Sequence, residues 1–309
     1  MSVMRSKLSF FLFVGSVGLA LLNTSVNAQK ARSTAVSVPK PIIFAVLNDG
    51  QMIEPIAHVE KGKLSETVNG SDESAVVEQF TKAYFGAKAS YRLIFGGANA
   101  GTVSIKPGNS KMECAPNMAQ VNVAATRPNL NLRGKVMALA TNVAVKKQGS
   151  GVRRLPNWPE RNEIDLLVKA EFTTNSVDTK KIDYHNLTAL DVNGDKKPEL
   201  VGSFWAENEP KSRTLLFFIA EKGTDGKLSI VYSDLRTIKE DEVMSGEISA
   251  VDEGVYHELL LDVFDYDGDG ISEIFTYVQA FEGASFYAYK RNDGKWAKVY
   301  EVSNYHCGY

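Results

Sequence analysis

One unit of this sequence occurs twice, and it limits the fold more than any other feature. Each copy places an acidic loop, 191–199 or 265–273, between two short apolar segments. Two more such segments follow each loop, joined by nearly identical Asp-Gly turns at 224–227 and 292–295. Short apolar segments bounded by turn residues are typical of β-strands. Each copy is therefore predicted to be a strand, an acidic loop and three further strands.

The second loop has the composition of a calcium site. Asp265, Asp267 and Asp269 occupy alternate positions, and Glu273 is the ninth residue. Carboxylates this close repel one another unless a cation neutralises them, and calcium accepts several oxygen ligands in a flexible shell. An EF-hand is excluded, because it needs a glutamate at the twelfth position, where this loop has Thr276.

The pattern Asp-x-Asp/Asn-x-Asp-Gly-x-x-acid between two strands resembles the FG-GAP and VCBS repeats, the calcium-binding β-blades of integrin-α-like proteins. The likeness covers about 184–234 and 256–302. In that family the side chains at positions one, three, five and nine and the carbonyl at position seven bind calcium. The resemblance therefore implies one or two Ca²⁺ ions and these ligands: Asp265, Asp267, Asp269, Ile271 and Glu273, and Asp191, Asn193, Asp195, Lys197 and Glu199.

The first loop departs from the pattern. Lys196 replaces glycine at position six, Lys197 follows it, and Asn193 replaces a carboxylate. A left-handed conformation at a residue other than glycine costs about 1–2 kcal/mol, and two lysines oppose a dication. We expect the second loop to bind calcium more tightly than the first. The alternative for either loop is an acidic turn without a metal.

The fold class predicted for the chain is mainly β with helical elements. Residues 29–40 are expected to be a disordered lead-in, and 41–146 an antiparallel β domain with one short helix. Residues 147–162 mix Gly, Ser, Pro and charge, which indicates a linker. The remaining domain, 163–309, would hold two four-stranded blades of the FG-GAP type. A propeller needs more blades than two, so we expect a compact β module.

Residues 1–28 predict a signal peptide. Arg5 and Lys7 form a basic start, 8–22 is an apolar run, and small side chains precede a cleavage point before Gln29. A membrane anchor is the alternative, but a spanning helix needs about 20 apolar residues, more than this run contains. We expect export to the periplasm or the cell exterior, with no stable membrane span after cleavage.

The chain has two cysteines, Cys114 and Cys307. In an oxidising compartment such a pair is expected to form a disulfide, which would fix the C-terminal end to the first half of the chain. The alternative is two buried thiols that do not meet.

The net charge argues against a nucleic-acid partner. The formal charge is −2, and removal of Arg5 and Lys7 with the signal peptide would make it −4. Proteins that bind nucleic acids by charge carry basic patches or stripes, and this sequence has none. We therefore expect no nucleic-acid binding.

The sequence has no G-x-S-x-G elbow, Walker loop or dinucleotide fingerprint, so we assign no catalytic and no cofactor-binding residue. His257-Glu258 begins like a zinc-protease motif, but residue 261 is leucine and not the second histidine. The glycine-rich segment 96–101 lacks the Lys-Ser/Thr of a phosphate loop and is predicted to be a turn. The scattered histidines are predicted to be packing or surface residues; they are His58, His185, His257 and His306.

These features favour an exported, non-catalytic binding or adhesion module that calcium stabilises. By analogy with the family it would recognise a protein or a glycan. The alternative is a secreted hydrolase or lyase that acts on polysaccharides, with structural calcium and an active site in the first domain.

Overall fold

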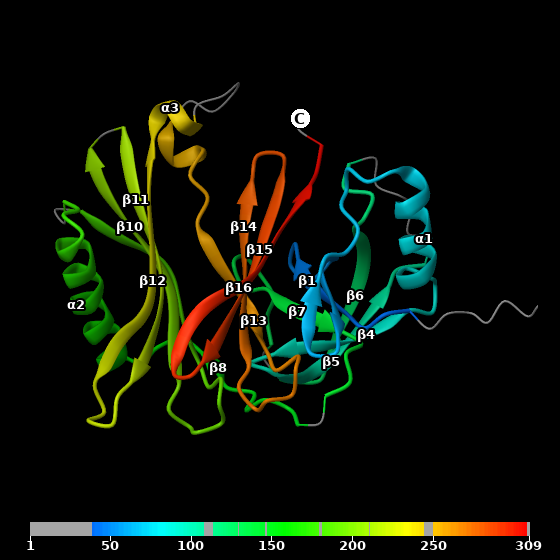
Figure 1. Ribbon diagram of the computed structural model, residues 1–309, viewed down its shortest axis with the longest axis horizontal. Helices are drawn as coiled ribbons and strands as arrows, with labels where there is room; N and C mark the ends of the chain where they lie inside the picture. Colours follow the sequence, from blue (N-terminus) through cyan, green and yellow to red (C-terminus); the bar gives the residue numbers. More distant parts are fainter. Residues whose placement is uncertain are drawn as a thin grey trace, which may run out of the picture. The chain divides into compact units, whose positions relative to one another are not determined.

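The computed structural model describes residues 39–107, 114–128, 130–145, 147–178, 181–209, 211–243 and 250–307. The predicted signal peptide and residues 29–38 of the predicted lead-in lie outside these ranges. The described part of the chain is mainly β, as predicted, with three antiparallel sheets of seven, five and four strands (Figure 1). Its helices are α1 (Ser74–Tyr84), α2 (Trp158–Thr174) and α3 (Glu240–Val243), with a 3-10 turn at Val251–Glu253.

The seven-stranded sheet, sheet A, closes on itself because β1 pairs with both β7 and β2. Its strands, in order, are β1 (Ile42–Leu47), β7 (Ala138–Thr141), β4 (Ser90–Phe95), β5 (Ala98–Ile105), β6 (Ala119–Ala125), β2 (Met52–Glu60) and β3 (Lys63–Ser65). Alternate side chains of a strand point to opposite faces. One of these faces contributes Phe44 and Leu93 to a buried core with Phe80 and Tyr84 of α1.

Sheets B and C contain the two copies of the repeated unit. Sheet B has, in order, β12 (Leu228–Lys239), β11 (Ser212–Lys222), β10 (Glu199–Glu209), β9 (Ile182–Leu190) and β8 (Arg153–Arg154). Sheet C has β13 (Glu258–Phe264), β14 (Glu273–Ala280), β15 (Gly283–Asn292) and β16 (Lys295–Tyr305). Each acidic loop joins the first two strands of its copy, as predicted. The prediction of four strands is wrong for sheet B, because β8 pairs with the end of β9 and adds a fifth.

Helix α2 covers one face of sheet B (Figure 1). It begins with a capping box, in which the Asn157 side chain accepts a hydrogen bond from the N–H of Glu160 at 2.9 Å, and the Glu160 carboxylate accepts one from the N–H of Asn157 at 2.9 Å. Ile164, Val168 and Phe172 lie on the buried side of the helix and share a core with sheet B. The cap therefore sets where the helix starts, and the apolar side holds it on the sheet.

The strands β13 and β14 of sheet C are packed on both faces. Phe264 and Phe275 belong to a core shared with sheet A, whereas their neighbours Val263 and Ile274 belong to a core shared with sheet B. Successive residues of a strand point to opposite faces, so a sheet covered on both sides is apolar at successive positions. The acidic loop between β13 and β14 is thus attached to strands that are packed on both sides.

A buried ion pair joins the three sheets. Asp262 of β13 is 0% exposed and lies 2.7 Å from Arg153 of β8. Its carboxylate also accepts hydrogen bonds from the N–H groups of Gly96 and Gly97, at 3.0 Å each, in the turn between β4 and β5. Gly96 has a φ of +64°, and a Cβ there would lie 2.7 Å from the backbone of Gly151. The predicted glycine-rich turn therefore presents main-chain donors to a buried carboxylate.

Cys114 and Cys307 form the predicted disulfide, with Cα atoms 4.9 Å apart and a sequence separation of 193. Two residues just before Cys307 also contact sheet A. Nε2 of His306 lies 2.8 Å from the buried carboxylate of Glu54, and the side chain of Asn304 donates a hydrogen bond to a backbone carbonyl of β2 at 3.0 Å. The end of β16 is thus fixed to sheet A. A disulfide indicates an oxidising compartment. None of the described helices has the length and apolar character of a membrane span.

Candidate functional site

The two acidic loops have the same hydrogen-bonded conformation. In each loop the side chain at position one accepts hydrogen bonds from the backbone N–H groups at positions four and six. The side chain at position three accepts one from the N–H at position five, and the side chain at position five accepts one from the N–H at position seven. The side chain at position nine accepts one from the N–H at position two. The accepting side chains are Asp191, Asn193, Asp195 and Glu199, and Asp265, Asp267, Asp269 and Glu273. The loops therefore correspond residue for residue at the predicted ligand positions.

Both loops need left-handed backbone at the same two places. At position four, Gly194 and Gly268 have φ values of 78° and 80°. At position six, Gly270 has a φ of 95° and Lys196 a φ of 67°. Glycine adopts this conformation freely, whereas lysine is strained there by about 1–2 kcal/mol. The first loop thus keeps the conformation of the second despite an unfavourable residue.

The second loop brings together carboxylates that could hold a metal ion. Asp265, Asp267 and Asp269 each offer an oxygen, and these oxygens lie within 4.8 Å of one another. Glu273, at the ninth position, is 1% exposed and lies at the start of β14. Oxygen-only donor sets of this kind suit hard cations such as calcium. The carbonyl of Ile271, and the corresponding carbonyl of Lys197 in the first loop, stay predicted ligands.

A lysine that the sequence reasoning did not consider contacts this carboxylate group. The Nζ atom of Lys290, on β15, lies 2.5 Å from Asp267, 2.7 Å from Asp269 and 2.8 Å from Glu273. Burial disfavours the charged amine, but its hydrogen bonds to the carboxylates outweigh this and raise the pKa of Lys290. Burial also raises the pKa of Glu273 to about 8, although contact with the lysine opposes that rise. Lys290 thus acts as a cation inside the second loop.

The first loop has an acidic residue where the second has Lys290. Glu221 of β11 accepts hydrogen bonds from Arg291 at 2.9 Å and from the indole N–H of Trp296 at 2.6 Å. Burial raises the pKa of Glu199 to about 7, and the nearby charges of Glu221 and Asp195 add to the rise. Among the described residues, no lysine forms an ion pair with the buried carboxyl group of Glu199, the ninth residue of the first loop.

The two loops touch each other. The N–H of Ser272, in the second loop, donates a hydrogen bond to the carbonyl of Val192, in the first, at 2.7 Å. The hydroxyl of Ser150 donates to the carbonyl of Asp191 at 3.0 Å. Between the loops and the segment 147–152 lies a cleft of about 380 Å³. A change in one loop can thus reach the other through a direct backbone contact.

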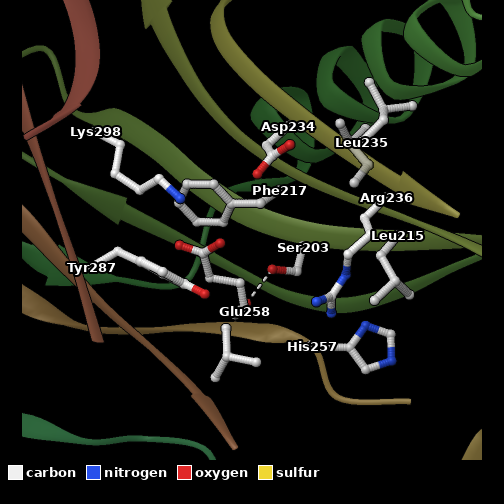
Figure 2. Close-up of a pocket in the computed structure, with 12 residues that line it drawn as sticks. Ser203, Leu215, Phe217, Asp234, Leu235, Arg236, His257, Glu258, Tyr287 and Lys298 are labelled. Atoms are coloured by element: carbon white, nitrogen blue, oxygen red, sulfur yellow. Dashed lines mark hydrogen bonds between the residues drawn. The ribbon is translucent and has the colours of Figure 1, made fainter. Parts of the chain in front are cut away.

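A separate pocket of about 190 Å³ lies between sheets B and C. Figure 2 shows the side chains of Glu258, Asp234 and Lys298 directed into it. Glu258 accepts hydrogen bonds from the hydroxyls of Thr276 at 2.5 Å and Tyr289 at 2.8 Å. Burial raises the pKa of Glu258 to about 7, although these two hydrogen bonds oppose the rise. The pocket therefore holds a carboxyl group with a raised pKa and a second acidic side chain.

A larger cleft, of about 670 Å³, adjoins this pocket, and both are lined by His257. The rings of His257 and His185 are stacked with centroids 3.8 Å apart. Nζ of Lys135 lies 3.2 Å from Nδ1 of His185. These two histidines are predicted to be packing or surface residues, and they pack on each other because β9 and the start of β13 meet between sheets B and C.

Sequence reasoning missed the charged groups around the loops and clefts for one physical reason: they come from different strands. Lys290 lies on β15 opposite the ninth loop residue, and this cross-strand register is not contained in the spacing of the sequence. Glu258, Asp234 and Lys135 carried no signal, because only the tertiary fold brings them to their clefts. Comparison of the chain with family models, curated proteins and solved structures gave no match.

Proposed function

We propose that this chain is an exported, calcium-stabilised binding module of the FG-GAP or VCBS kind, with no catalytic role. The observation that carries the proposal is the shared hydrogen-bond scheme of the two acidic loops, in which eight predicted side-chain ligands occupy equivalent positions. Sheets B and C would then be its two blades, the first with β8 as an added strand. Its partner would be a protein or a glycan.

Calcium would act by holding the loops together. Each loop joins two core strands, and the loops contact each other through Ser272 and Val192. An ion that binds only the folded protein adds RT ln(1 + [L]/Kd) to its stability. Calcium and the Lys290 ammonium would compete for the same carboxylates, those of Asp267, Asp269 and Glu273. The ion would therefore displace the lysine from at least part of this group.

Export is supported by two independent features. The predicted signal peptide at 1–28 would direct the chain out of the cytoplasm. The disulfide between Cys114 and Cys307 indicates an oxidising compartment. Calcium is abundant outside the cell, where sites with modest affinity are filled. A periplasmic or secreted location thus fits a module that uses calcium structurally.

Calorimetric titration of the purified protein with calcium tests the proposal. We expect up to two ions, with the second loop filled first. Asp265→Ala/Asp269→Ala should remove the tighter site, and the matched pair Asp191→Ala/Asp195→Ala should spare it. Loss of half the calcium stoichiometry at low micromolar calcium in the Asp191/Asp195 variant would reverse the ranking, and the absence of any calcium binding would refute the proposal.

A second candidate function rests on the pocket of Figure 2. A carboxyl group with a raised pKa that shares a pocket with a second carboxylate is a feature of enzymes that hydrolyse glycosidic bonds by acid-base catalysis. Glu258 and Asp234 would take these two roles, in a polysaccharide hydrolase or lyase with structural calcium. This site lies between sheets B and C and not in the N-terminal region where the alternative placed it. Hydrolysis of a polysaccharide panel that is lost in Glu258→Gln would favour the enzyme.

A further inference from the structure

Basic groups from three parts of the chain meet at the cleft of about 670 Å³. Lys135 precedes β7 of sheet A, His185 is on β9 of sheet B, and His257 precedes β13 of sheet C. The imidazole rings stack 3.8 Å apart, and the Lys135 ammonium lies 3.2 Å from Nδ1 of His185. An ammonium group can only donate, so Nδ1 of His185 accepts and its proton is on Nε2. The fold therefore concentrates three basic groups at one wall of an open cleft.

The charges around this wall leave the group without a bound counter-ion. No carboxylate in the described ranges lies within ion-pair distance of Lys135, His185 or His257. Asp252, the acidic group that acts on His257, is bound to Arg213 at 2.7 Å. Asp49 lines the same cleft, and its carboxylate accepts a hydrogen bond from the N–H of Gly134 at 2.9 Å.

The other titratable groups that act on the two imidazoles are basic. Arg236 acts on His257 and donates a hydrogen bond to the carbonyl of Tyr256 at 3.2 Å. Desolvation, followed by the charges of His257 and Lys135, lowers the pKa of His185 to about 3. Desolvation, followed by Lys135 and Arg236, lowers that of His257 to about 4. Both imidazoles are therefore neutral at neutral pH, and Lys135 and Arg236 carry the positive charge at this wall. A bound anion would neutralise that charge and could accept hydrogen bonds from the imidazole N–H groups.

The rest of the cleft wall suits a sugar ring. Its apolar side chains include Leu47, Met52 and Tyr277, and its amide side chains are Asn48, Gln51 and Gln279. Ligand pockets typically combine apolar walls with a few polar groups that fix orientation. Amide groups both donate and accept hydrogen bonds, as sugar hydroxyls require. The cleft thus offers a cationic end and an amphipathic wall.

We propose that the cleft lined by Lys135, His185 and His257 binds a small acidic sugar through its carboxylate. The proposal does not depend on calcium binding by the acidic loops. A metal ion is a poor alternative occupant, because the Lys135 ammonium occupies Nδ1 of His185 and repels cations. The carboxylate of the sugar would lie against Lys135 and the two imidazoles, with its ring against the apolar wall.

Calorimetry with glucuronate, glucose and inorganic sulfate tests the proposal on the full, calcium-free protein. We expect glucuronate to bind and sulfate to compete with it. Glucose should bind at least about tenfold more weakly than glucuronate, because a hydrogen bond to a charged group contributes about a factor of ten in affinity. Lys135→Met should weaken glucuronate binding by about tenfold. The matched control Lys169→Met removes an exposed lysine on α2 and should bind like the parent protein.

The pH dependence gives a second readout. A bound carboxylate favours protonated imidazole and would raise the pKa values of His185 and His257 from about 3 and 4, so glucuronate binding should take up protons and strengthen as the pH falls from about 6 towards 4. This gain should be reduced in His185→Gln and His257→Gln. The proposal would be overturned if glucuronate did not bind, if glucose bound as tightly as glucuronate, or if sulfate did so. It would also be overturned if Lys135→Met melted like the parent protein and bound glucuronate equally well.

Discussion

Lys290 and Glu221 occupy the same position in the two repeats, each in register with the ninth residue of its acidic loop. On β14 and β15 the pairing of Ile274 with Tyr289 puts Lys290 opposite Glu273. On β10 and β11 the pairing of Leu200 with Ala220 puts Glu221 opposite the ninth residue of the first loop. Two loops with the same backbone scheme therefore have neighbours of opposite charge.

Replacing Lys290 by methionine should strengthen calcium binding to the second loop. The calcium ion would no longer compete with an ammonium that contacts three carboxylates at 2.5 to 2.8 Å. We expect an affinity at least about tenfold higher by calorimetry, and a lower melting temperature in chelator. Lys295→Met, which removes an exposed lysine from the nearby turn, is the control. Unchanged affinity and unchanged chelator stability in Lys290→Met would show that Lys290 is not the internal cation.

Glu258 should make the protein less stable as the pH rises. Its folded pKa of about 7 lies above the usual 4.5, so its contribution is fully present below about 4.5 and is lost as the pH rises towards 7. Glu258→Gln cannot ionise and should lack this slope, which for one proton is at most about 1.4 kcal/mol per pH unit. Denaturant unfolding of both proteins across this range measures the difference. Parallel stability curves would contradict the raised pKa.

Glu160 should behave in the opposite way. Hydrogen bonds from Arg154 lower its pKa to about 2, so its stabilisation is present above the usual 4.5 and is lost as the pH falls towards 2. Glu160→Gln keeps the shape of the capping box but removes the charge. We expect its free energy of unfolding to be about 1–2 kcal/mol lower than that of the parent at neutral pH. The loss should shrink in acid. Asp165→Asn, on the exposed side of α2, should have no comparable effect at neutral pH.

Removal of the disulfide should destabilise the chain strongly. Cys114 and Cys307 close a loop with a sequence separation of 193, and a bond across such a long loop restricts the unfolded chain. We expect Cys114→Ser/Cys307→Ser to lose about 2–5 kcal/mol in denaturant unfolding. Reductant should lower the free energy of unfolding of the parent protein by a similar amount and leave that of the double variant unchanged. A double variant as stable as the parent would show that the contacts of β16 suffice.

The sequence was sufficient for the parts of the fold that depend on local spacing. The acidic loops and their flanking strands follow from residues within about ten positions of one another, because loop ligands and turn glycines act on their own backbone. Apart from the disulfide, contacts between distant segments of the chain could not be predicted. Arg153 lies in a segment that is predicted to be a linker, yet it forms β8 and binds Asp262 at 2.7 Å. The stacked histidines, likewise, depend on how sheets B and C meet.

The central claim is that calcium stabilises this fold through its acidic loops, and thermal unfolding tests it most directly. The purified protein and Asp265→Ala/Asp269→Ala would be melted in calcium and in chelator. At a calcium concentration about a hundredfold above Kd the stabilisation should be about 2.7 kcal/mol, which raises the melting temperature of the parent by about 5 °C or more. The account predicts that the variant loses most of this rise. Identical melting of both proteins with and without calcium would contradict it.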